Sequence, residues 1–268
     1  MKKYIPVTIY QTTGSASEYS KYACNFYNGC SSKCIYCYNR HGDRAKTLGG
    51  DYPTLKKSLY DEDSAIYFLE DDIDDNLGEL QEHGFLLNFV SDPFLPETME
   101  LNIRAILLAQ SYDVPVRTLT KQAEWVDEFL VLDSINKNLI ACGFSLTGHD
   151  ELELGAASNI ERIQAMKKLK NAGFKTFASI EPIIGFPSSL KMIRETIGSC
   201  DLYLIGLQRF KKYPKDVIKK FIFDVRDIVK PHKNVKVYFK DSINEIYPIR
   251  DIEHSQLVGR DYNIFKSQ

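Results

Sequence analysis

From residue 85 onward, short apolar runs alternate with longer stretches in which apolar residues recur every three or four positions. The short runs predict buried strands, and the periodic stretches predict helices. The predicted strands cover 85–90, 116–120, 139–146, 174–180, 202–207 and 235–239, and the predicted helices cover 96–110, 123–136, 159–171, 187–197 and 215–229. Strands that alternate with helices in this way are typical of parallel βαβ units, so the pattern indicates an α/β fold.

The part of the chain before residue 85 is less regular. Residues 1–20 are mixed, with a candidate strand at 5–10, and 21–25 predicts a short strand that leads into a cysteine-rich loop. Residues 61–82 hold ten acidic and no basic side chains. Their spacing fits no calcium-loop template, so we expect a solvated insertion or helix edge and no metal site. The total of about seven strands is smaller than the eight that close a full barrel.

Composition adds limits on size, charge and location. The chain has 268 residues, 44% of them hydrophobic, which is enough for one domain with a full core. The net charge is −2, and since residues 61–82 contribute −10, the remainder carries +8. Scattered surface lysines would explain that excess, and a basic face around a cleft is the alternative. No charged leader and no run of eighteen apolar residues is present, so we expect a cytoplasmic protein without a membrane partner.

Three of the six cysteines, Cys30, Cys34 and Cys37, fall within eight residues. Thiolates at this spacing can hold one side of an iron-sulfur cluster. Because a four-iron cluster normally takes four cysteines, three local ligands would leave one iron open to another ligand. On spacing alone, Cys24 or His41 could instead complete a structural zinc site. A disulfide framework is typical of small secreted proteins and does not suit this chain.

The cysteine segment resembles a known family. The pattern C-x3-C-x-aromatic-C, with Tyr36 as the aromatic residue, is similar to the signature of radical S-adenosylmethionine (SAM) enzymes. The wider strings N-x-Y-x-G-C at 25–30 and Y-C-Y at 36–38 resemble the spore photoproduct lyase-like branch and a related group often found in phage genomes. The fold that this resemblance implies is an incompletely closed (β/α)6 TIM-like barrel with parallel strands, over residues 1–240. Its cluster loop would span 24–44, and residues 241–268 would pack on the barrel as an extension.

The resemblance also implies cofactors. Cys30, Cys34 and Cys37 would bind a 4Fe-4S cluster, and the amino and carboxylate groups of SAM would chelate its fourth iron. An electron from a donor of the flavodoxin or ferredoxin type would then split SAM into methionine and a 5′-deoxyadenosyl radical, which abstracts hydrogen from a substrate. Tyr36 and Tyr38 would pack beside the cluster and SAM.

Polar residues follow the predicted strands, where a barrel of this kind places its functional side chains. The resemblance implies that Lys121 meets the SAM carboxylate and that Ser145 contacts the ribose or the methionyl end. Glu181 is expected near the ribose or the substrate. Asp92, within Ser91-Asp92-Pro93, stands where many radical SAM enzymes carry Gly-Gly-Glu, so Asp92 or the strand carbonyls are the candidates for the SAM amino group.

The substrate is less well defined by the sequence. A nucleic-acid base is favoured by analogy with the lyase-like branch, with a peptide or a small metabolite as the alternative. The branch carries a cysteine hydrogen donor near the end of the second strand, and residues 88–96 contain no cysteine, which argues against thymine-dimer repair. Cys142 and Cys200 are expected to be core residues. A different class of function remains open. In this alternative, the chain is a non-catalytic zinc-binding α/β module that binds a partner or nucleic acid.

Overall fold

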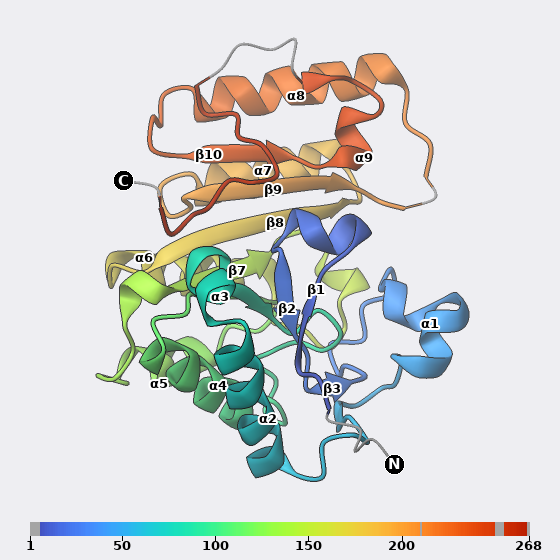
Figure 1. Cartoon of the computed structure of the whole chain (residues 1–268). Helices are drawn as coiled ribbons and strands as arrows, with labels where there is room; N and C mark the ends of the chain where they lie inside the picture. The colour runs from blue at the N-terminus through green and yellow to red at the C-terminus, as the bar shows by residue number, and fades with distance from the viewer. Residues whose placement is uncertain (1–5, 210, 250–254, 267–268) are drawn as a thin grey trace.

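The computed structural model describes residues 6–209, 211–249 and 255–266. One curved sheet forms its centre, with strands in the order β1-β2-β5-β6-β7-β8-β9-β10 (Figure 1). The neighbours from β2 to β10 pair in parallel, and β1 pairs antiparallel to β2 at the edge. The strands are β1 (Ile9–Gln11), β2 (Tyr22–Cys24), β5 (Phe85–Leu87), β6 (Val116–Thr120), β7 (Ile140–Ser145), β8 (Lys175–Ile183), β9 (Leu202–Leu207) and β10 (Lys236–Phe239).

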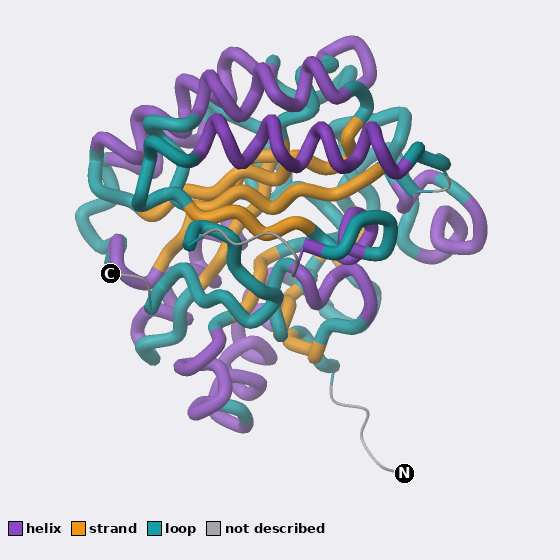
Figure 2. Tube along the Cα trace, turned by 90° about the horizontal axis from the view of Figure 1, so that it is seen from above, coloured by secondary structure: helices purple, strands orange, loops and turns teal. Residues whose placement is uncertain are grey.

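Helices follow the strands and cover the outer face of the sheet, as Figures 1 and 2 show. They are α1 (Gly42–Thr47), α2 (Glu62–Asp75), α3 (Leu77–His83), α4 (Met99–Ser111), α5 (Trp125–Leu130), α6 (Asn159–Asn171), α7 (Phe186–Thr196), α8 (Lys215–Val229) and α9 (Asp241–Asn244). Within the described residues, no hydrogen bonds join β1 to β10, so the sheet curves without closing. The predicted fold class, an incompletely closed α/β barrel with parallel strands, is confirmed, with seven parallel strands where the resemblance implied six.

Where the predicted elements differ from the observed ones, the backbone gives the reason. The strand predicted for 85–90 ends at Leu87 because Asn88 has φ +61°, a left-handed conformation that cannot continue the ladder. The helix predicted for 123–136 ends at Leu130 because the chain then tightens into three-residue turns, such as the bond from Leu132 N–H to the Phe129 carbonyl at 3.2 Å.

Helix α6 shows how local sequence fixes an element that later positions the site. Ser158 and Glu161 form a capping box, each side chain accepting the backbone N–H of the other, which satisfies donors that a helix start leaves free. The inward face buries Ile163 and Met166, together with the charged Arg162. A charged residue on an apolar helix face requires a partner in the interior.

The acidic segment forms helices α2 and α3. Ala65, Leu69 and Ile73 are completely buried on the inner face of α2, so the acidic side chains occupy the other faces. At the other end of the chain, residues 255–266 lie along the inner side of the sheet, where Leu257 forms a bridge with Val237 of β10. None of the helices in the described ranges is long and apolar enough to cross a membrane.

Candidate active site

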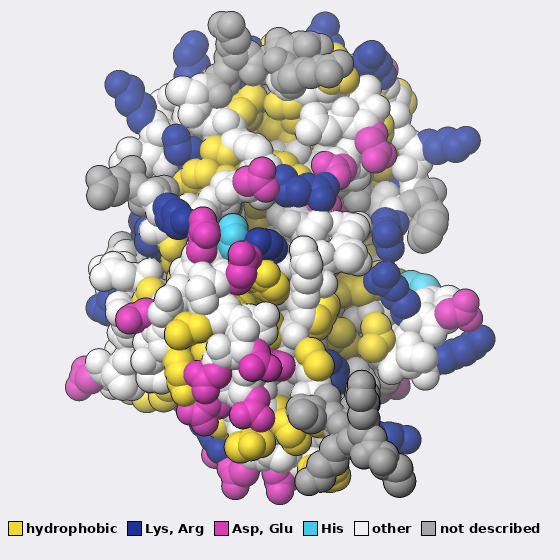
Figure 3. All heavy atoms as spheres, in the orientation of Figure 1, with side chains coloured by type: hydrophobic (Ala, Val, Ile, Leu, Met, Phe, Trp, Pro, Cys, Tyr) yellow, Lys and Arg dark blue, Asp and Glu magenta, His cyan; other side chains and the backbone are white. Residues whose placement is uncertain are grey.

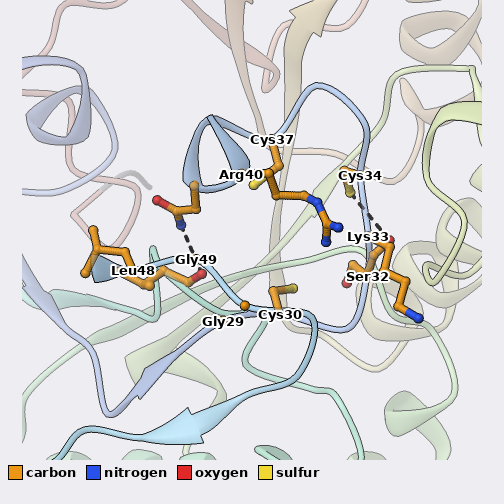
Figure 4. A pocket seen from close by; sticks show the side chains of 12 residues that line it. Gly29, Cys30, Ser32, Lys33, Cys34, Cys37, Arg40, Leu48 and Gly49 are labelled. Carbon is orange, nitrogen blue, oxygen red and sulfur yellow. Dashed lines mark hydrogen bonds between the residues drawn. The ribbon is translucent and has the colours of Figure 1, made fainter. Parts of the chain in front are cut away.

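The cysteine loop connects β3 (Tyr27–Asn28) to a short 3-10 turn at Tyr38–Arg40, and β3 pairs with β4 (Thr54–Leu55). Cys30, Cys34 and Cys37 line one small cavity of about 30 Å³, and Figure 4 shows them arranged around it. Gly29 makes the close turn possible. Its φ is +78°, and a Cβ at this position would lie 2.2 Å from the Tyr52 carbonyl oxygen. The predicted cluster residues therefore come together around a common space.

A segment that follows β7 holds the other side of this loop. The backbone N–H of Ile35 donates to the Leu152 carbonyl at 2.9 Å, and the N–H of Gly155 donates to the Ser32 carbonyl at 2.9 Å. Cys34 and Glu153 face each other in an antiparallel bridge. These backbone bonds fix the loop to the barrel at the residue that carries the second thiol.

The end of β5 contacts the same loop from a different direction. The Asn25 Oδ1 accepts hydrogen bonds from the backbone N–H groups of Phe89 at 2.6 Å and Val90 at 3.0 Å. In return, the Tyr38 hydroxyl donates to the Phe89 carbonyl at 2.7 Å and the Asn39 amide donates to the Val90 carbonyl at 3.1 Å. Through these bonds, Tyr38 and Asn39 hold the cysteine loop against the end of β5. The same bonds occupy the carbonyls of Phe89 and Val90.

Asp92 lies two residues after Val90, and its carboxylate accepts three hydrogen bonds from the protein. Its Oδ1 accepts from the Thr120 hydroxyl at 2.5 Å and from the Phe94 N–H at 3.1 Å, and its Oδ2 accepts from the Lys121 N–H at 2.7 Å. Burial raises the pKa of Asp92, against the opposite effect of these three bonds. Asp92 therefore joins the ends of β5 and β6.

Lys121 follows directly after β6, and its side chain reaches the cysteine loop. Its Nζ lies 5.8 Å from the ring centroid of Tyr36. Burial acts to lower the pKa of Lys121, but the neighbouring acidic groups of Tyr36, Cys34 and Glu153 outweigh it, so the pKa is raised and the amine stays charged. No carboxylate in the described part of the chain lies within 4 Å of this Nζ. The ammonium is thus available to an anionic ligand beside the thiols.

Glu153 and Arg162 are charged neighbours of Lys121. The sequence alone did not identify either of them. They pair with each other, with both side chains completely buried. Glu153 also accepts from the Tyr36 hydroxyl, and Arg162 donates to the Ser145 carbonyl at 2.6 Å. The available signal was the position of Arg162 on the apolar face of its helix. Through this pair, Tyr36 of the cysteine loop is connected to Ser145 at the end of β7.

The surroundings of Cys34 and Cys30 disfavour their thiolate forms. Burial raises the pKa of Cys34 to about 11, and burial together with the Asp92 carboxylate raises the pKa of Cys30. Metal ligation needs the thiolate form, so a bound metal would have to supply the compensating positive charge.

Three sulfur ligands from one loop line the cavity, and this is the kind of donor set that an iron-sulfur cluster takes. Among the described residues, no three His, Cys, Asp or Glu side chains converge closely enough to hold one metal ion. A tetrahedral zinc with Zn–S distances of about 2.3 Å would hold its sulfur atoms within about 4 Å of one another. Cys24 is fully buried in β2, and the His41 Nε2 lies 3.0 Å from the Ile35 carbonyl oxygen. A zinc ligand at either position stays a prediction that metal analysis tests.

A polar cofactor would also find unused groups here. The Ser91 hydroxyl and the Asn39 Oδ1 are buried without a hydrogen-bond partner among the described residues. Buried polar atoms normally have hydrogen-bond partners. The Asn39 Oδ1 on the cysteine loop and the Ser91 hydroxyl after β5 could therefore bond to the amino or carboxylate group of a ligand.

Glu181 belongs to a different group of side chains. It pairs with Lys240 at 2.5 Å and accepts from the Tyr19 hydroxyl at 2.6 Å, both through Oε2. Lys240 is 1% exposed and also lies 3.4 Å from the Glu18 carboxylate. Tyr19 connects this group to the cysteine loop, because its ring centroid lies 5.8 Å from that of Phe89, whose carbonyl accepts from the Tyr38 hydroxyl. The role of Glu181 near the ribose or the substrate stays a prediction. The Glu181 Oε1 takes no part in these bonds and lies where Gly206 lacks a side chain.

Comparisons with known proteins bear on the fold of this chain. No family model matches the chain. It is 28% identical over 171 residues to an uncharacterized protein of Methanocaldococcus jannaschii, a match that covers 62% of this chain and 61% of that protein, which is less than two thirds of its length.

The solved structures give the stronger likeness. Spore photoproduct lyase, as a variant with bound AdoMet and dinucleoside spore photoproduct, matches with a TM-score of 0.67 and 18% identity, covering 86% of this chain and 80% of that one. The lyase complexed with the dinucleoside alone matches with a TM-score of 0.65. Streptococcus suis SuiB bound to S-adenosylmethionine matches with a TM-score of 0.54 and 14% identity, covering 87% of this chain and 50% of that one. The partial-barrel fold of these radical SAM enzymes is therefore the fold of this chain.

Proposed function

We propose that this chain, which resembles spore photoproduct lyase in sequence motif and in fold, is a radical SAM enzyme. Cys30, Cys34 and Cys37 would bind a 4Fe-4S cluster, and Lys121 would bind the SAM carboxylate. The observation that carries the proposal is the position of Lys121. Its charged, uncommitted ammonium lies beside the three-thiol cavity, and an ammonium facing a carboxylate forms a strong charge-assisted bond.

When bound, the reduced cluster would supply the electron that cleaves SAM to methionine and the 5′-deoxyadenosyl radical. The residues of this chain would bind and orient the cofactor. Ser91 precedes Asp92, its buried hydroxyl has no hydrogen-bond partner among the described residues, and it would accept from the SAM amino group. Ser145, whose carbonyl is fixed by Arg162, would contact the ribose or methionyl end. Tyr36, held by Glu153, covers the lysine on the side of the loop and excludes water from it.

We propose a nucleic-acid base as the substrate. The lyase that shares this fold has been solved with a dinucleoside spore photoproduct. The cysteine loop and α1 also present basic side chains, visible at the right of Figure 3, where Arg44 lies 5.4 Å from the ring centroid of Tyr38. Lysine and arginine side chains at such a rim can contact phosphates. Because 88–96 lacks a cysteine, and Cys142 and Cys200 are buried with raised pKa values, we do not extend the proposal to thymine-dimer repair.

Anaerobic reconstitution with iron and sulfide tests the proposed function. We expect about four irons per chain and, with SAM and dithionite, release of 5′-deoxyadenosine. Reduced flavodoxin or ferredoxin should replace dithionite if the electron donor is of that type. A preparation that binds iron but never cleaves SAM would contradict the proposed chemistry. One zinc ion that survives reconstitution, and is lost when Cys24 or His41 is replaced, would establish the zinc module instead.

A further inference from the structure

A second and larger cavity, of about 460 Å³, lies on the inner side of the sheet. Its walls come from the parallel strands β6, β8, β9 and β10 and include Arg117, Phe177 and Tyr238. Residues 11–12 and 17–21 of the amino-terminal segment and 259–264 of the carboxy-terminal segment cover it. Pockets for small ligands commonly have volumes of about 300 to 1,000 Å³, so this cavity has the size of a ligand site.

Arg117 faces into this cavity with poor compensation for its charge. Arg117 is only 9% exposed. Its guanidinium makes long contacts, at 3.3 Å to the Ser20 hydroxyl and 3.4 Å to both the Tyr19 carbonyl and the Asn263 Oδ1. It also lies 5.3 Å from the ring centroid of Phe265. No carboxylate of the described residues comes within 4 Å of it.

The other charged groups around the cavity are largely committed elsewhere. Lys21 pairs with Glu79 at 2.6 Å, and Arg260 pairs with Asp241. The Glu18 carboxylate accepts from the Asp241 N–H at 2.6 Å and lies 3.4 Å from Lys240. Asp261 and His83 complete the ionisable lining.

The contrast with the other buried arginine is informative. Arg162 is fully buried and pairs with the fully buried Glu153. Arg117 has no such partner among the residues that the structure describes, and burial lowers its pKa to about 10, which still leaves it charged at neutral pH. A buried charge without a counter-ion is costly, so an anion in the cavity would relieve a penalty that the protein alone leaves in place.

The remaining lining defines the rest of the ligand. Phe177, Leu202, Leu204, Tyr238 and Ile264 form one buried apolar cluster and all line the cavity. An apolar or aromatic body could bury its surface against them, while an anionic end group meets the guanidinium fork. Because the carboxylates of Glu18 and Asp261 also line the cavity, a group with a single negative charge is favoured over one with several.

We propose that this cavity binds a small organic monoanion, with a carboxylate or phosphate diester group on Arg117 and an apolar body against the cluster around Phe177. The site is separate from the proposed SAM site. Arg117 and Lys121 are four residues apart along β6, which corresponds to about 13 Å of strand. Tyr19 lines the cavity, and its hydroxyl lies 2.7 Å from the Ser179 hydroxyl and donates to Glu181 at 2.6 Å.

Calorimetric titration of the reconstituted protein tests this site, with phenylacetate and the diester methyl phenyl phosphate as the monoanionic probes and phenylacetamide as the uncharged control. We expect saturable binding of at least one anion, and binding of the amide at least about tenfold weaker. The stronger of the two anions identifies whether the site takes a carboxylate or a phosphate. Equal binding of the anions and the amide, or no saturable binding of either anion, would overturn the proposal.

Substitution of the arginine gives the second arm. Arg117→Gln should weaken anion binding at least about tenfold while 5′-deoxyadenosine release stays within about twofold of wild type. Arg194→Gln, the same change at an exposed position of α7, should alter neither quantity. Should Arg117→Gln fail to fold, wild-type crystals soaked with 4-bromophenylacetate decide the matter through the anomalous signal of bromine. A bromine peak inside the cavity supports the proposal, and peaks only elsewhere refute it.

Discussion

The Asp92 carboxylate accepts the backbone N–H of Lys121, with 2.7 Å between Oδ2 and N. The same carboxylate accepts a hydrogen bond from the Thr120 hydroxyl, so Asp92 fixes both the last residue of β6 and the first residue after it. This relationship explains how a flexible lysine is directed toward the cysteine loop. The backbone is held where the strand ends, and the side chain extends toward Tyr36.

Lys121→Met should weaken SAM binding and leave the cluster intact. Methionine keeps the length and apolar stem of lysine but removes the charge that would meet the SAM carboxylate. We expect the Kd for SAM to rise about tenfold or more, with unchanged iron content. Equilibrium binding of SAM to reconstituted protein measures this. Lys167→Met, at an exposed position of α6, is the matched control, and an unaltered Kd in Lys121→Met would rule out the carboxylate contact.

Replacing any one of Cys30, Cys34 and Cys37 by alanine should abolish 5′-deoxyadenosine release, because each thiolate would hold one iron of the cluster. Cys24→Ala should keep both iron and activity, since that thiol is buried in β2. Iron analysis and product chromatography after reconstitution provide the measurements. Iron lost from Cys24→Ala but kept in a loop variant would show that the ligand assignment is wrong.

Glu153→Leu should destabilise the protein by about 3–5 kcal/mol, because it leaves the buried guanidinium of Arg162 without its buried partner and with only the half-exposed Asp150 carboxylate, 3.6 Å away. The double replacement Glu153→Leu with Arg162→Met removes both charges and should recover a large part of that loss. Anaerobic urea unfolding of both variants gives the free energies. If the double variant is no more stable than Glu153→Leu, the uncompensated charge is not the cause.

Alkylation of cluster-free protein should reveal the raised pKa of Cys34. The thiolate is the reactive form, so the rate follows the ionised fraction. With a pKa of about 11, the rate at Cys34 should keep rising about tenfold per pH unit up to about pH 11, while a thiol of ordinary pKa levels off near 9. Iodoacetamide labelling followed by mass spectrometry of each cysteine measures this. A plateau at Cys34 near pH 9 would contradict the effect of burial.

What the sequence determined by itself is what depends on near neighbours along the chain. The spacing of apolar residues defined the strands at 116–120 and 202–207 and the helices at 159–171 and 215–229, to the residue. The cysteine spacing defined the loop, and the position of Lys121 after a strand placed it at the carboxyl edge of the sheet. Regular backbone structure and short-range spacing are local properties, so a local pattern is enough to predict them.

Tertiary structure decided which polar groups share an environment. Glu181 was expected near the ribose or substrate, and that role stays a prediction, but its carboxylate bonds to Lys240 and Tyr19, which are far from it in sequence. The pairing of Glu153 with Arg162 under Tyr36 likewise joins separate segments of the chain. A buried charge takes whichever opposite charge the packing of distant elements brings within reach, and no periodicity in the sequence records that choice.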